Sequence, residues 1–199
     1  MDRDNLRLIA ALLALAVVAG AWLQGRPVPH LDGVLVQEEP AQGPPDVGSP
    51  WPYNGYALRA LASFQLTARV LSAEHYRFDR GAALAPVDLA LGWGPMSDSA
   101  TLRHFKITQG ARFYTVYPQD GAADLDDAMV HSANMHLIPA TESVRRTLLA
   151  VKPGQLVTLR GELVEVTSSD GFRWRSSLTR TDRGAGACEL VWVEEARFR

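Results

Sequence analysis

The chain has 199 residues, a formal net charge of −2 and a pI of about 6.2. This length allows one domain with an additional terminal segment, and the slightly acidic balance lacks the basic footprint of non-specific nucleic-acid binding. Because Cys188 is the one cysteine in the sequence, an intramolecular disulfide, a cysteine-rich zinc site and an iron–sulfur cluster are excluded.

The first long segment is apolar and uncharged. It runs from Leu8 to Gly25, between Arg7 and Arg26. As a helix it would be roughly 27 Å long, close to the hydrocarbon thickness of a bilayer. We therefore predict an N-terminal transmembrane helix within residues 1–25, which makes the lipid bilayer a partner through residues 8–25. The alternative is a signal peptide cleaved near Ala21, at an A-x-A pattern.

The charges beside this segment predict its orientation. Arg3 and Arg7 precede it, and only Arg26 follows closely, which favours a cytoplasmic N-terminus. Asp2 and Asp4 weaken the positive region that a signal peptide needs, so we favour an uncleaved anchor. The predicted location is the inner membrane, single-pass, with the C-terminal domain in the periplasm. Secretion after cleavage is the alternative.

Residues 26–52 have the composition of a linker. They contain seven of the twelve prolines of the chain and should be extended and semi-rigid. They would act as a spacer that holds the domain off the membrane, or form an arm without a role. A short strand at 34–36 could still pack against the domain. Residues 53–199 are predicted to form a β-rich globular domain.

In the first half of this domain, apolar and polar residues alternate over 62–70, which predicts a half-buried strand with Phe64, Leu66, Ala68 and Val70 inward. Residues 74–92 look irregular. Ser97 or Asp98 can cap a short helix that ends near residue 104. A hairpin is expected from 105 to 117, with Gln109-Gly110 at its turn.

In the second half, Thr141 can cap a helix over 142–150 with a stripe of Val144, Leu148 and Val151. A long strand follows, in which Gly161 indicates a bulge or a barrel corner. The remaining expected elements are a short helix at 124–130 and strands at 135–138, 172–178 and 189–198.

The order of these elements is strand-rich with one good helix. We predict a mainly β (α+β) domain, a small antiparallel β-barrel that is OB-like, with one packed helix between its third and fourth strands. Other α+β rolls fit the same order of elements.

Three stretches carry a resemblance to a family. Residues 88–98 (DLALGWGPMSD), 131–139 (HSANMHLIP) and 174–182 (WRSSLTRTD) are similar to those of an uncharacterised family of bacterial membrane-associated proteins. That family has no assigned activity. The resemblance implies an envelope location and adds no catalytic residue.

The densest polar cluster lies between His131 and His136. In an extended segment, Ser132, Asn134 and His136 share one face and His131 points away. The two histidines are therefore not a ready-made metal site, and further ligands would have to come from residues such as His104 or Asp98. We favour a structural hydrogen-bonding role for Asn134 and His136, with no metal and no cofactor.

The loop from Gly92 to Asp98 is the most distinctive in the chain. Trp93 and Met96 could line a pocket, but large apolar residues mostly serve packing, so we favour a plug at the end of the barrel. The residues that would line a ligand pocket, if one exists, are Trp93, Asp98, Asn134, His136 and Arg180.

Enzymatic alternatives rest on residue types alone. Ser176 or Ser177 with His136 and Asp182 would supply a hydrolase triad, and Cys188 with His136 a nucleophile–base pair. The sequence has no G-x-S-x-G elbow.

The leading hypothesis is therefore a membrane-tethered periplasmic domain that binds or scaffolds another envelope component, without enzymatic activity. The first alternative is a hydrolase or metal-dependent enzyme that uses residues 131–136. The second is an OB-type oligonucleotide binder, suggested by the aromatic–basic alternation in FRWR (172–175). Because Phe172 and Trp174 should point inward, we expect no nucleic-acid partner.

Overall fold

A computed structural model describes residues 26–46, 48, 50–180, 182, 184 and 186–199. These residues form a mainly β structure, with one eight-stranded sheet and a separate two-stranded hairpin. The predicted membrane segment and the cleavage site near Ala21 lie outside the described residues. Within the described part of the chain, no helix is long and apolar enough to cross a membrane.

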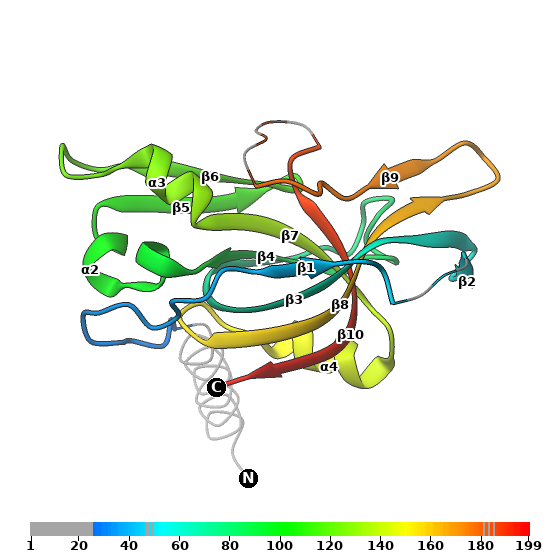
Figure 1. Cartoon of the computed structure of the whole chain (residues 1–199), viewed down its shortest axis with the longest axis horizontal. Coiled ribbons are helices and arrows are strands. Elements are labelled where there is room, and N and C mark those ends of the chain that lie inside the picture. The colour runs from blue at the N-terminus through cyan, green and yellow to red at the C-terminus, as the bar shows by residue number, and fades with distance from the viewer. Residues whose placement is uncertain (1–25, 47, 49, 181, 183, 185) are drawn as a thin grey trace, which may run out of the picture.

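Ten strands, three α-helices and one 3-10 helix make up the described structure (Figure 1). Their bounds are β1 (Ala41–Gly43), β2 (Trp51–Tyr53), β3 (Tyr56–His75), β4 (Val87–Gly92), η1 (Gly94–Ser97), α2 (Ser99–Leu102), β5 (Phe105–Gly110), β6 (Phe113–Pro118), α3 (Leu125–Val130), β7 (Ser132–Pro139), α4 (Glu142–Ala150), β8 (Leu156–Thr167), β9 (Arg173–Arg175) and β10 (Glu189–Phe198).

Five strands pair in a ring. β3 pairs with both β4 and β8, β4 continues to β7, β7 to β10, and β10 to β8. The helix α4 lies between the third and fourth of these strands, as predicted. The prediction of an entirely antiparallel sheet is wrong at one pair, because β7 and β10 run parallel. The long connection between them, through α4 and β8, permits this direction, which a tight hairpin would not.

The core confirms the alternation expected in β3. Phe64, Leu66, Ala68 and Val70 are all buried in the main cluster, and β3 extends beyond the predicted 62–70. Val144 and Leu148 of α4 join the same cluster, as the helical stripe predicts. A second cluster at the other end of the sheet includes Leu58, Leu84, Ile138, Val166 and Leu190, with Phe172 and Trp174 packed against it.

Helix caps are confirmed, but several local predictions fail, among them the strand expected over 172–178, which forms only at Arg173–Arg175. The side chains of Asp98 and Thr141 accept hydrogen bonds from backbone N–H groups of α2 and α4. Strand β4 forms where irregular structure is expected, because all of its residues are buried and no polar face alternates with an apolar one. The hairpin turns at Ala111-Arg112, with φ of 50° and 69°, and not at Gln109-Gly110. These positive angles are typical of a type I′ turn.

The Pro-rich segment predicted as a linker packs on the domain in its first part, and no strand forms at 34–36. The N–H of Val28 donates to the carbonyl of Pro153 at 2.8 Å, and the N–H of Gly94 donates to the carbonyl of Val36 at 2.8 Å. Val36 is buried. Farther along, β1 and β2 both pair with β3.

Gly161 lies where β8 and β10 approach closely. A Cβ at Gly161 would lie 1.9 Å from the carbonyl oxygen of Trp192, a separation that only backbone movement could relieve. The register irregularity expected near this glycine lies opposite it, in β10 between Val193 and Glu195.

We expect Gly161→Ala to lower the free energy of unfolding by about 2–3 kcal/mol, since the added methyl group overpacks the contact between the strands. Urea denaturation measures the loss. Gly110→Ala is the matched control, because a Cβ there meets no atom within 4 Å. Equal stability of the two variants would contradict the close approach.

Candidate functional site

A groove of about 500 Å³ opens at the end of the sheet that holds the second apolar cluster. Its walls come from the β3–β4 loop, the β5–β6 turn and the hairpin that leads into β9. His136 of β7 also lines it. The lining residues used below are Asp79, Arg80, Gly81, Arg112, Phe113, His136, Phe172, Arg173, Trp174, Arg175 and Cys188.

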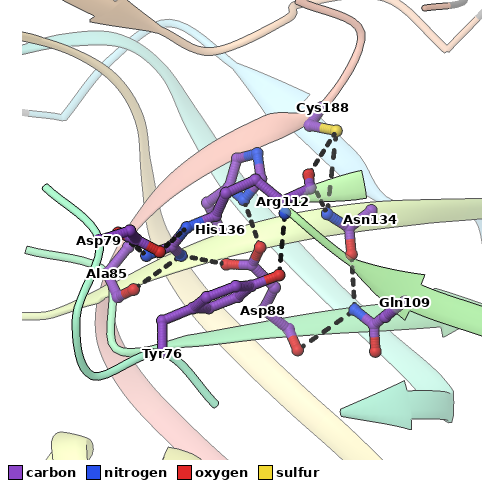
Figure 2. A network of polar contacts seen from close by, with 9 residues as sticks. All are labelled: Tyr76, Asp79, Ala85, Asp88, Gln109, Arg112, Asn134, His136 and Cys188. Carbon is purple, nitrogen blue, oxygen red and sulfur yellow. Dashed lines mark hydrogen bonds and ion pairs between the residues drawn. The ribbon is translucent and has the colours of Figure 1, made fainter. Parts of the chain in front are cut away.

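A buried ionic network lies beside this groove (Figure 2). Asp88 of β4 is completely buried. Its Oδ1 accepts a hydrogen bond from Arg112 at 2.8 Å, and its Oδ2 lies 2.9 Å from Nδ1 of His136. A buried carboxylate requires such compensation, because removal from water strongly disfavours the charged form.

Arg112 connects three parts of the chain. Its guanidinium donates two hydrogen bonds to Asp79, one to the carbonyl of Ala85 and one to Asp88. It also lies 3.6 Å from the ring centroid of Tyr76, whose hydroxyl oxygen accepts the backbone N–H of Arg112. One side chain therefore fixes the β3–β4 loop and the β5–β6 turn onto β4 (Figure 2).

Strand register places the partners together. Asp88 and His136 are directly paired residues of β4 and β7, so their side chains share a face. Asn134 is two residues before His136 on the same face. It accepts a hydrogen bond from Gln109 at 2.7 Å and donates one to the backbone carbonyl of Arg112 at 3.2 Å. The network thus continues along β7 to the hairpin.

The imidazole ring of His136 is held in place by its neighbours. The contact between its Nδ1 and Asp88 has the distance of a hydrogen bond but not the angles, so we treat it as an electrostatic contact. Its ring centroid lies 4.7 Å from that of Trp174, and the side chain is 4% exposed. The other nitrogen, Nε2, points away from Asp88 by the geometry of the ring.

The five residues proposed from the sequence do not all share one cavity, but Asn134 and Arg180 both line a cavity of about 130 Å³. Asn134 and His136 belong to the network above. Trp93 is buried in the main core, as is Met96 in a smaller cluster, which agrees with the packing interpretation of that loop. Arg180 lies 5.8 Å from the Trp93 ring and donates to the carbonyl of Pro40. Asp98 caps α2 and accepts the N–H of Gly33, so it serves the docked N-terminal segment.

The enzymatic constellations are not assembled. Ser177 donates to Asp182 at 2.7 Å, whereas His136 faces Asp88. The hydroxyl of Ser176 donates to the carbonyl of Ser177 and accepts the N–H of Leu190. Burial raises the pKa of Cys188 to about 11, which keeps the thiol protonated and a poor nucleophile at neutral pH.

No metal centre is evident in the described part of the chain, where no group of three or more His, Cys, Asp or Glu side chains is placed to hold an ion. The sequence pointed to Asn134 and His136 but did not predict that Asp88, Arg112 and Trp174 lie beside them. A single charge within the apolar run of β4 was the available signal for Asp88. Nothing local marks Arg112, whose partners are distant in sequence.

A scan against protein-family models, a search of curated proteins and a search of solved structures find no match to this chain. The residues themselves therefore carry the functional argument.

Glu189 is a buried acid at the start of β10. It is 3% exposed, and its Oε2 has no hydrogen-bond partner among the described residues. Burial raises its pKa from 4.5 to about 7. The folded state therefore binds this proton more tightly than the unfolded state. The resulting stability is fully present below pH 4.5 and is lost as the pH rises to about 7.

We expect Glu189→Gln to remove this dependence, so that the variant gains up to about 3 kcal/mol over the parent between pH 4.5 and pH 8. Urea denaturation across this range measures the difference. Glu195→Gln, at a half-exposed position of the same strand, should follow the parent. A constant difference between Glu189→Gln and the parent at all pH values would contradict the assignment.

Proposed function

We propose that the chain is a non-enzymatic binding domain of the cell envelope, anchored in the inner membrane by residues 8–25 with its C-terminal domain in the periplasm. The groove beside His136 is its ligand site, and a further envelope component is its partner. The sequence of the N-terminal segment supports the location, and the resemblance noted above is consistent with it. The groove carries the binding function.

The arrangement of the strands supports an OB-like barrel. The pairings return to β3 after five strands, and one helix lies between the third and fourth strands of the ring. OB-like barrels bind ligands on the face of their second and third strands, between the first–second and fourth–fifth loops. In this chain those strands are β4 and β7, and the corresponding connections join β3 to β4 and β8 to β10.

The groove occupies that position. Asp79, Arg80 and Gly81 come from the first loop, Phe172 and Trp174 from the second, and His136 from the third strand of the ring. Its volume is within the usual range for small-ligand sites, and its lining combines aromatic surfaces with a few fixed polar groups. This coincidence of position and composition is the observation that carries the proposal.

Contacts between the Pro-rich segment and the domain would affect how close the domain lies to the membrane. Asp32 forms two hydrogen bonds with Arg103, and Ser97 binds the backbone of Leu35 and Val36. With residues 8–25 in the bilayer, these contacts would hold the domain close to the membrane surface, and not at the end of a free spacer.

Chemical-shift mapping of the full chain with small planar fragments, such as indole and phenol, tests the site. We expect the fragments to shift signals of the groove residues, and Phe113→Ala, which removes a half-exposed lining side chain, to weaken these shifts. Tyr117→Ala is the matched control, since Tyr117 is equally exposed on β6 but does not line the groove. Shifts confined to other surfaces would refute the proposal.

A further inference from the structure

The charges that face the groove are compensated within the protein. Arg112 is bound to both Asp79 and Asp88, and Arg80 pairs with Asp170. A site for a polyanion needs cations that are free to neutralise phosphates. Here these guanidinium groups already have carboxylate partners.

The arginines of β9 are also bound to a carboxylate. Side chains alternate along a strand, and Trp174 packs against His136 on one face of β9. Arg173 and Arg175 reach Glu165 on the opposite face, where Arg59 also binds the same carboxylate. Hydrogen bonds and charge from Arg59 and Arg173 hold the pKa of Glu165 down at about 2. Arg173 and Arg175 also line the groove, so each of its arginines has a carboxylate partner.

The groove offers aromatic surface from separate segments of the chain. Trp174 and Phe172 come from the β8–β9 hairpin, and the half-exposed Phe113 comes from the β5–β6 turn. Phe78, next to the groove residue Asp79, is 97% exposed. Large exposed aromatic side chains grouped at a groove are typical of ligand sites.

The ion pairs on this groove also supply hydrogen-bonding groups of both kinds. Asp79 is 39% exposed and accepts, whereas Arg80 is 53% exposed and donates. A hydroxyl group can donate and accept at once, so neighbouring hydroxyls fit a carboxylate beside a guanidinium. The C–H faces of a sugar ring can meanwhile lie on aromatic rings.

We infer that the groove binds an uncharged glycan strand, whose sugar rings stack on its aromatic side chains and whose hydroxyls bind Asp79 and Arg80. This inference rests on the proposed function of the groove and adds the class of ligand.

Titration of the full chain with the N-acetylglucosamine tetramer, in a detergent without a sugar head group, tests the inference. We expect saturable chemical-shift changes at groove residues. The affinity should change less than about twofold between about 50 and 200 mM salt, a range over which binding to phosphates falls steeply. Phe113→Ala should weaken binding about tenfold, the loss of one aromatic contact worth about 1.4 kcal/mol. Tyr117→Ala should leave it unchanged.

Single-stranded oligothymidylate is the competing ligand. Salt-sensitive binding of this oligomer in the groove, without binding of the sugar, would overturn the glycan inference and leave the proposed function intact. Sugar binding that survives both Phe113→Ala and Arg80→Ala would also overturn it. Arg80→Ala is a second variant at an exposed position, should Phe113→Ala fold poorly. If neither oligomer binds, the inference fails. If the planar fragments also miss the groove, the proposed function fails with it.

Discussion

The structure of the groove depends on the burial of one carboxylate. Asp88 is inaccessible to solvent, and a charge in that position is tolerated only with partners close by. Arg112 and His136 supply them from the β5–β6 turn and from β7. Because the same guanidinium also binds Asp79 and Ala85, compensation of Asp88 fixes the loop that forms one wall of the groove.

This constraint also determines what the groove can bind. An arginine that is already bound to two carboxylates is a structural element and a poor receptor for a phosphate. Arg173 and Arg175 of β9 also line the groove, and both are bound to Glu165. An aromatic groove whose arginines are already bound to carboxylates fits the uncharged glycan that we propose as its ligand.

Local patterns predicted much of the fold. Alternation identified β3, strands were also predicted at the positions of β8 and β10, and the caps at Asp98 and Thr141 located α2 and α4. Patterns failed where tertiary context decides the structure. β4 is buried on both faces and shows no alternation, and the parallel pairing of β7 with β10 depends on the path of the whole chain. The type I′ turn at Ala111-Arg112 lacks the glycine that usually marks one.

The site was predictable to a smaller extent. The polar segment of β7 was recognised, and Asn134 and His136 do belong to the network. Their partners Asp88 and Arg112 are far away in sequence, and only strand register and the hairpin bring them close. Trp93 and Asp98 were also named as pocket residues, but they have the other roles predicted for them, since Trp93 packs in the core and Asp98 caps a helix.

A double-mutant cycle with Arg112→Met and Asp88→Asn tests the central claim most directly. Removal of Arg112 alone should lower the free energy of unfolding by about 3–5 kcal/mol, because Asp88 then remains buried without its main partner. In the Asp88→Asn background the same substitution should cost at least about 2 kcal/mol less. The exposed pair Arg80 and Asp170 is the control and should show a much smaller coupling. A coupling between Arg112 and Asp88 within about 0.5 kcal/mol of zero would contradict the account.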